Sequence, residues 1–242
     1  MSQRLDCFDV TRQPGVTDEH RALQAAVRRF VEQEIVPNAA AWDEAETFPR
    51  ELYDKAAAIG LLGLGFPAEY GGTPCDSLSK LIATTELCNA GVGGVNASLM
   101  SHTIMLVPIL LAASEALKQQ VVPRILAGQA IGALAVTEPS GGSDVARLKT
   151  RAEPVPGGYK LNGSKIYITN ASYSKYITLT AVTDPSKGAN GISAFIMDTA
   201  TPGFRVGKKE KKMGLRGSDT VEVVFEDCLI PGDQMLGDQT GG

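Results

Sequence analysis

The stretch Leu134-Ala-Val-Thr-Glu-Pro-Ser-Gly-Gly-Ser143 decides how this sequence is organised, because it joins a short apolar run to a loop of small and polar residues. Its first three residues predict a buried strand, and the hydroxyl of Thr137 follows at the end of that strand. Pro139 stiffens the exit, while Gly141 and Gly142 permit positive φ and a close approach to bare backbone. The N–H groups of such a loop can form a concave anion site. Taken alone, the same residues are also typical of a hairpin turn.

The hydrophobic pattern changes near residue 130. Before that point, apolar residues recur every three or four positions, which predicts helices. The first helix begins after Thr17, whose side chain can cap it, and ends or kinks at Pro37. A second is expected from Pro49 to Gly60, and a third opens at Ser77. A long apolar helix is expected around residues 100–111.

After residue 130 the expected elements are short strands bounded by turns. Pro156-Gly-Gly158 and Asn162-Gly163 are hairpin signals, and the second is the stronger. The expected strands span residues 131–137, 149–155, 159–161, 165–169, 176–183, 192–198 and 221–226. The sequence therefore predicts an N-terminal all-α helical domain, residues 1–130, followed by an antiparallel β-barrel or sandwich domain, residues 131–242.

Composition fits a globular protein and argues against several functions. The chain has 242 residues, of which 43% are hydrophobic and 21% charged, so it can bury a sizeable core and is not expected to be disordered. A net charge of -4 gives no reason to expect a nucleic-acid partner. With only His20 and His102, we expect no histidine-based metal site. The cysteines form no C-x-x-C pair and are expected to be reduced: Cys7, Cys75, Cys88 and Cys228.

No segment of the sequence predicts export or membrane insertion. Residues 1–7 lack the apolar core of a signal peptide. The longest apolar run, 104–113, is interrupted by Pro108 and is too short to span a bilayer, so we expect a buried helix there. The expected location is cytoplasmic, or the mitochondrial matrix if the chain is processed from a eukaryotic precursor.

Several motifs accompany the loop at 137–144, in a fixed order along the chain. They are Gly65-Phe-Pro-Ala-Glu-Tyr-Gly-Gly72, Asn162-Gly-Ser-Lys-Ile-Tyr-Ile-Thr-Asn170, Met213-Gly-Leu-Arg-Gly-Ser-Asp-Thr220 and Val224-Phe-Glu-Asp-Cys-Leu-Ile-Pro231. Together they closely resemble the signatures of the acyl-CoA dehydrogenase family, over roughly residues 17–242. The resemblance implies a helical domain, a middle β-barrel and a C-terminal helical bundle. The sequence stops where relatives enter the third part, so we expect a truncated chain.

The resemblance also implies a binding site for FAD. Thr169 is the candidate to bond flavin N5, Tyr167 stands where the family commonly has Trp and would cover a ring face, and Ser143 would also meet the pantetheine arm of an acyl-CoA substrate. Glu138 lies in the flavin loop but is not the base in relatives; the family's glutamate base lies beyond Gly242, so the catalytic residue is unknown. The expected FAD contacts are Leu134, Ala135, Val136, Thr137, Gly141, Gly142, Ser143, Tyr167, Ile168 and Thr169.

The implied function is α,β-desaturation of an acyl-CoA thioester to a 2-enoyl-CoA, as in fatty acid metabolism. In that reaction the hydride goes to FAD N5 and the electrons pass to an electron-transfer flavoprotein. The full-length protein would be a homo-oligomer. The alternatives are a non-catalytic module that binds FAD or acyl-CoA, and a flavin oxidase or monooxygenase of the same fold. The basic residues between 205 and 216 could attract CoA or FAD phosphates or could form a solvated loop, which the sequence favours.

Overall fold

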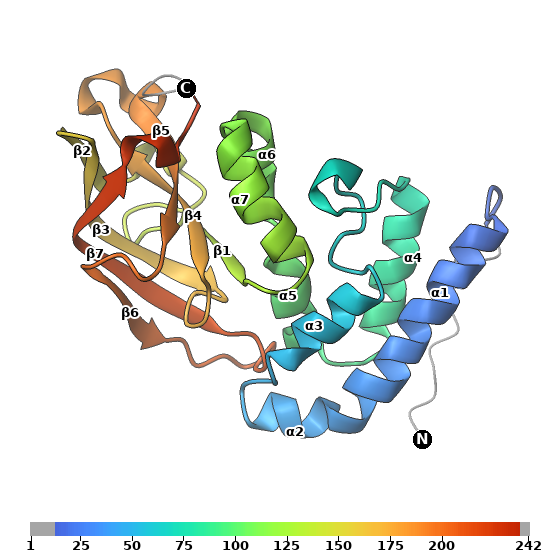
Figure 1. Cartoon of the computed structure of the whole chain (residues 1–242). Coiled ribbons are helices and arrows are strands. Elements are labelled where there is room, and N and C mark those ends of the chain that lie inside the picture. Colours follow the sequence, from blue (N-terminus) through green and yellow to red (C-terminus); the bar gives the residue numbers. More distant parts are fainter. Residues whose placement is uncertain (1–12, 238–242) are drawn as a thin grey trace. The chain divides into compact units, whose positions relative to one another are not determined.

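The computed structural model of this chain describes residues 13–237, and these form two compact units. The first unit holds the chain up to Leu99 with the segments Leu126–Gln129 and Lys212–Ser218. The second holds Met100–Ile125, Ala130–Lys211 and the chain from Asp219 onward. The helical half and the β half of the sequence are therefore both present, which confirms the predicted fold class (Figure 1).

The first unit is helical. Its helices are α1 (Asp18–Phe30), α2 (Ala39–Glu44), α3 (Glu51–Ala58), α4 (Ser77–Cys88) and most of α5 (Gly93–Ser101). Thr17 caps α1 as predicted, because its side chain accepts a bond from the amide of His20. The helix does not stop at Pro37 but passes through a π turn and a 3-10 turn into α2. An ion pair of 2.7 Å between Arg28 and the buried Glu86 fastens α1 to α4.

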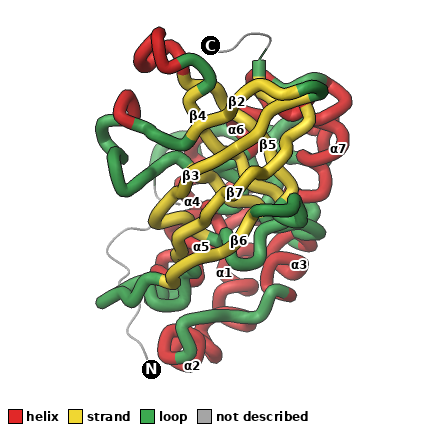
Figure 2. Tube along the Cα trace, turned by 90° about the vertical axis from the view of Figure 1, so that its left-hand side faces the viewer, coloured by secondary structure: helices red, strands yellow, loops and turns green. Residues whose placement is uncertain are grey.

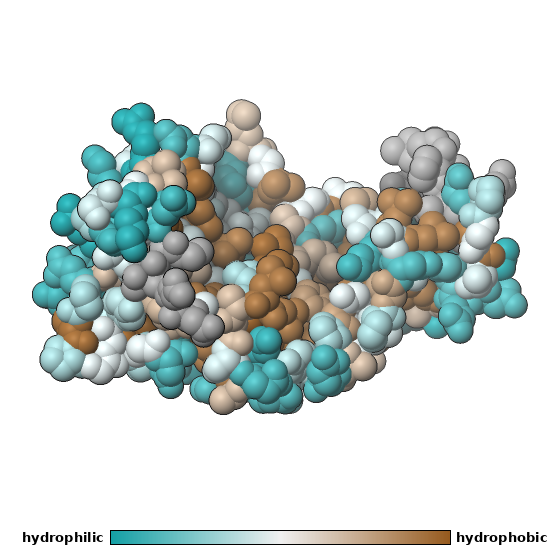
Figure 3. Space-filling model, turned by 90° about the horizontal axis from the view of Figure 1, so that it is seen from above, coloured by the Kyte–Doolittle hydropathy of each residue, from teal (hydrophilic) through white to brown (hydrophobic). Residues whose placement is uncertain are grey.

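The prediction of a single helix around residues 100–111 is wrong. The chain turns between α5, which ends at Ser101, and α6 (Leu106–Ala112), and α7 (Glu115–Leu126) follows. The stretch Gly93–Ala112 is long and apolar enough to cross a membrane by length and composition, a test that the core helices of soluble proteins also pass. α6 buries Leu106 and Ile109 but leaves Val107 53% and Leu111 80% exposed. Figure 3 shows that hydrophobic residues also gather on one face of the molecule.

The second unit is built on one sheet. Its strands are β1 (Gly132–Ala135), β2 (Arg151–Val155), β3 (Gly158–Thr169), β4 (Tyr176–Val182), β5 (Ile192–Asp198), β6 (Phe204–Lys209), β7 (Thr220–Pro231) and β8 (Met235–Leu236). The order is β6-β7-β3-β2-β4-β5-β8, with β1 beside β4. Most pairs are antiparallel, but β1 and β2 each run parallel to β4. Figure 2 shows β3, β7 and β6 lying side by side.

Helices α6 and α7 belong to the unit of the sheet, although they precede residue 130 (Figure 1). The Thr178 hydroxyl on β4 donates to the carbonyl of Met105 over 3.1 Å. Gly132 on β1 lies so close that a Cβ there would stand 2.0 Å from the Met105 sulfur. Residue 130 still lies between the part of the chain that forms helices and the part that forms strands. As a boundary between domains, it stays a prediction.

Two expectations about the strands are wrong. Asn162-Gly163 is no hairpin turn, because β3 runs unbroken from Gly158 to Thr169. The pairing with β7 shifts register there, and the extra residue lies on β7, since Leu161 pairs with Cys228 and Gly163 with Phe225. Gly163 adopts φ +147° at that register shift. The segment Phe204–Lys209, expected as part of an exposed loop, is the edge strand β6. Its exposed lysines and arginine suit an edge that must not pair with another chain.

Candidate functional site

The predicted glycine-rich loop leaves the sheet where β1 ends and turns back beside β3. Glu138 and Gly141 exchange backbone hydrogen bonds of 2.9 and 3.1 Å, which close the turn. The amide of Ile166 on β3 donates to the carbonyl of Thr137 over 2.9 Å. Gly142 stands against Thr137, since a Cβ at Gly142 would lie 3.1 Å from the threonine methyl carbon. The structure therefore brings the loop and β3 together.

Three neighbouring residues at the end of β3 have different surroundings. Tyr167 is 61% exposed and has φ +60°, an unusual conformation for an aromatic residue. A register shift against β7 between Lys165 and Ile168 accounts for it, because a bulge re-aims the side chains that it displaces. Ile168 is 2% exposed and packs in the sheet's core, so only its backbone can reach a ligand. Thr169 is half-buried.

The turn after Thr169 is fixed by polar contacts that the sequence did not reveal. Asn170 adopts φ +69°, a left-handed conformation that asparagine tolerates, and its side-chain oxygen accepts from the Tyr173 hydroxyl over 2.8 Å. The buried Asp219 accepts from the amide of Ser172 over 3.0 Å and from its hydroxyl over 2.9 Å. Asn170 and Asp219 both lie in motifs quoted above, which is the only sequence signal that could have identified them.

Several polar groups around this loop are available to a ligand. Within residues 13–237, neither the hydroxyl of Thr137 nor that of Thr169 has a hydrogen-bond partner, and the amides of Gly142 and Ser143 donate to no protein atom. Ser143 is exposed, whereas Leu134 and Val136 are half-buried and Ala135 is fully buried. Hydroxyls and amides of this kind suit the polar edge of a flavin ring, and the exposed Tyr167 could cover part of its face. The residues present therefore fit FAD.

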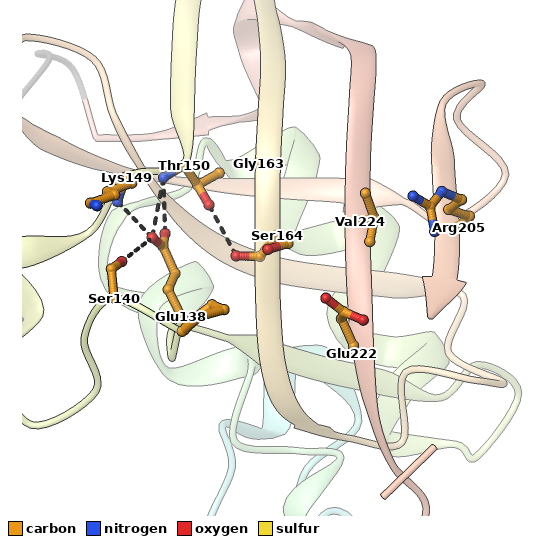
Figure 4. A pocket seen from close by; sticks show the side chains of 10 residues that line it. Glu138, Ser140, Lys149, Thr150, Gly163, Ser164, Arg205, Glu222 and Val224 are labelled. Atoms are coloured by element: carbon orange, nitrogen blue, oxygen red, sulfur yellow. Dashed lines mark hydrogen bonds between the residues drawn. The ribbon is translucent and has the colours of Figure 1, made fainter. Parts of the chain in front are cut away.

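The carboxylate of Glu138 is fully engaged inside the protein and is not poised as a base. It lies 2.8 Å from the ammonium of Lys165 and accepts from the amides of Lys149 and Thr150 (Figure 4). Burial alone would raise the pKa of this carboxyl, but the bonds from Lys165, Lys149 and Thr150 outweigh burial and hold the pKa below its usual value. The pair lies beside a cavity of about 640 Å³ on the side of the sheet that carries Ser164 and Glu222.

Metal chemistry and disulfides find no support among the residues that the structure describes. No three His, Cys, Asp or Glu side chains of residues 13–237 gather where they could hold a metal ion. Cys75, Cys88 and Cys228 are free thiols, and Cys7 lies outside the described residues. Burial is the main cause that raises the pKa of the Cys228 thiol, so it stays protonated and inert at neutral pH.

Comparison with protein families matches both halves of the chain. Residues 17–129 match the model of the acyl-CoA dehydrogenase N-terminal domain, and residues 133–228 match that of the acyl-CoA dehydrogenase middle domain. The chain belongs to the acyl-CoA dehydrogenase family. Members of this family are flavoprotein oxidoreductases, and the site described above lies in the middle domain.

Individual relatives agree with the family assignment. A probable acyl-CoA dehydrogenase of Mycobacterium leprae is 40% identical over 97% of this chain and 59% of its own length. An acyl-CoA dehydrogenase of Bacillus subtilis is 40% identical over 94% of this chain and 60% of its own length. The crystal structure of a probable acyl-CoA dehydrogenase from Mycobacterium abscessus superposes with a TM-score of 0.90 at 41% identity, covering 94% of this chain and 60% of that one. The chain thus spans about three fifths of these relatives.

Proposed function

We propose that this chain supplies the flavin-binding part of an acyl-CoA dehydrogenase. The observation that carries the proposal is the contact of the loop 134–143 with the last part of β3, where the hydroxyls of Thr137 and Thr169 have no hydrogen-bond partner among residues 13–237. The comparisons lend support, since the structure of a glutaryl-CoA dehydrogenase from Mycobacterium smegmatis in complex with FADH2 matches with a TM-score of 0.82 at 32% identity. It covers 93% of this chain and 57% of that one.

In the proposed reaction, an acyl-CoA thioester loses hydrogen from its α and β carbons to give a 2-enoyl-CoA. Bound FAD would supply the redox chemistry by accepting the hydride at N5. Thr169 and the loop amides would hold and orient the polar edge of the ring, and Ser143 would border both ring and thioester. The α proton requires a carboxylate base. Glu138 does not provide it, because its oxygens are bonded to Lys165 and to two backbone amides.

The proposed binding site is tested by removing two hydroxyls that it assigns to the ligand, those of Thr169 and Ser143. The double variant Thr169→Val and Ser143→Ala should weaken FAD binding by about tenfold or more, since each lost bond contributes roughly 1 kcal/mol. The matched control is Thr84→Val with Ser77→Ala, two exposed positions on α4. Flavin fluorescence quenching measures both dissociation constants. Equal affinity in the two double variants would count against the site.

The reaction itself is tested by anaerobic titration of the FAD-loaded chain with butyryl-, octanoyl- and palmitoyl-CoA. Bleaching of the flavin absorbance would support dehydrogenation and name the preferred chain length. Bound but unbleached flavin would identify a non-catalytic FAD-binding module instead. The engaged state of the Glu138 carboxylate is the observation that favours this second candidate for the described residues.

A same-fold flavin enzyme with another substrate is the other candidate. The structure of PigA with FAD and proline matches with a TM-score of 0.86 at 31% identity, covering 95% of this chain and 61% of that one. Oxygen consumption without acyl-CoA turnover would favour this class. An electron-transfer flavoprotein as acceptor, a homo-oligomeric assembly and the compartment in which the protein works stay predictions.

A further inference from the structure

Two opposite charges are buried together behind the proposed flavin loop. Lys165 is 0% exposed and Glu138 is 4% exposed, and 2.8 Å separates the ammonium from the nearer carboxylate oxygen. Lys165 occupies an inward-facing position of β3, where a neighbour such as Leu161 is apolar. An apolar side chain of similar volume in place of such a pair is often neutral or stabilising, so stability does not account for the charges. Their contacts show another role.

The ammonium of Lys165 lies where β1 and β4 part. The parallel pairing of these strands ends at Ala135 and Leu179. At the next residue of each strand, Lys165 donates to the carbonyl of Val136 over 3.0 Å and to the hydroxyl of Thr180 over 3.3 Å. The lysine thus supplies the donor that the carbonyl of Val136 needs as the loop leaves the sheet.

The carboxylate of Glu138 fixes the far side of the same loop. It accepts from the amide of Lys149 over 2.6 Å, from the amide of Thr150 over 3.1 Å and from the hydroxyl of Ser140 over 3.1 Å (Figure 4). The segment 149–150 leads into β2, so the loop is tied to three strands through one ion pair. Its donors toward the proposed ligand, the hydroxyl of Thr137 and the amides of Gly142 and Ser143, take no part in these bonds.

We propose that the buried Lys165–Glu138 pair is a positioning device that holds residues 136–143 in the flavin-binding conformation before any flavin arrives. The inference rests on the proposed function, because it assigns these residues to the same site. The proposal gives neither residue a contact with the flavin, because their charged groups are bonded to Val136, Thr180, Lys149, Thr150 and each other. A loop held in advance loses less conformational freedom on binding, and a site organised in this way binds more tightly than the same groups on a loose loop.

The test uses the whole 242-residue chain and removes both charges at once, as Lys165→Met with Glu138→Leu. Each single variant strands a buried charge and can fail to fold, whereas the double variant leaves none. The control is Lys160→Met, which removes a half-exposed lysine of the same strand from its weaker pairs with Glu153 and Asp227. Thermal unfolding establishes that the variants fold. Hydrogen exchange without flavin then reports the loop, and an FAD titration reports affinity.

The double variant should keep the melting temperature of the wild type, exchange faster at 136–143 but not in β7, and bind FAD about tenfold more weakly or worse. The absorption band of the bound flavin should also change shape, which a purely structural role elsewhere would not produce. The control should match the wild type in all of these. Unchanged exchange and unchanged FAD affinity in a folded double variant would overturn this inference alone. A wild-type chain that binds no FAD would overturn the proposed function and this inference with it.

Discussion

Replacing Gly163 with alanine should destabilise the sheet unit far more than the same change at Gly157, although both glycines have positive φ and lie in the same hairpin. Gly163 has φ +147° where β3 shifts register against β7, and a Cβ there would lie 2.5 Å from the Thr150 hydroxyl oxygen and 2.7 Å from its Cα. Gly157 has φ +85° in the turn between β2 and β3, with nothing within 4 Å of a Cβ.

The magnitudes follow from these surroundings. A φ near that of Gly163 is almost confined to glycine and costs about 1–3 kcal/mol for another residue. The overlap with the backbone of Thr150 adds an overpacking cost of about 1–3 kcal/mol. We therefore expect Gly163→Ala to lower the free energy of unfolding by about 2–6 kcal/mol. Gly157→Ala carries only the left-handed conformational cost, about 1–2 kcal/mol.

Equilibrium unfolding in urea, followed by far-UV circular dichroism, measures both variants in the transition of the same unit. The difference between their midpoints reports the overlap with Thr150 together with the rarer φ of Gly163. If Asn162-Gly163 formed the exposed hairpin turn that the sequence suggests, the two alanine variants would cost the same. Equal midpoints would therefore refute the unbroken β3 and its register shift against β7.

Three further predictions concern the site and pH. Tyr167→Gly should relieve the left-handed strain at φ +60°. Because the ring is 61% exposed, the free energy of unfolding should stay within about 1 kcal/mol of the wild type. FAD titration should nevertheless show weaker binding, and tighter binding would contradict the role given to the ring. Burial lowers the pKa of His102 to about 3, so the unfolded chain takes up a proton below its own value near 6.5 while the folded chain does not. The free energy of unfolding should therefore decrease as the pH is lowered from 6.5 to 3, by up to about 1.4 kcal/mol per pH unit. Urea unfolding of His102→Phe should lack this contribution to the pH dependence. Hydrogen bonds from the Ser79 amide and side chain, then from His20, lower the pKa of Asp76 to about 2. The stabilisation from this cap should therefore be complete above pH 3.8 and be lost as the pH falls toward 2. Asp76→Asn should reduce the dependence of the free energy of unfolding on pH in this acid range, and an unchanged dependence would argue against the cap.

Much of this fold could be predicted from local chemistry. Thr17 caps α1 and Pro156-Gly157 turns β2 into β3 because capping and turn formation depend on residues only a few positions apart. The continuation of β3 through Gly163 could not be predicted this way, because Asn-Gly has a local preference for turns. The close approach of Thr150 and the pairing with β7 decide the outcome there. The strand β6 was missed because edge strands carry charges that resemble those of a loop.

In the candidate site, too, some residues could be predicted from the sequence and others could not. The loop 134–143 and Tyr167 to Thr169 were identified through the family motifs, and the structure brings them together through the bond between Ile166 and Thr137. The supporting contacts of Lys165, Asn170 and Asp219 depend on segments far apart in sequence, such as Ser172 with Asp219, and no periodicity predicts them. One feature of the sequence does point to Lys165: it is a charged residue at an inward-facing strand position, and a buried charge needs a buried partner.

Amide NMR spectra of the isotope-labelled chain, recorded during an FAD titration, show whether FAD binds between the loop 136–143 and the end of β3. Chemical-shift changes should be concentrated at Thr137, Gly142, Ser143 and Thr169, with few changes in α1 or α4. Changes spread over other elements, or none at FAD concentrations that would detect a millimolar dissociation constant, would contradict binding at this place.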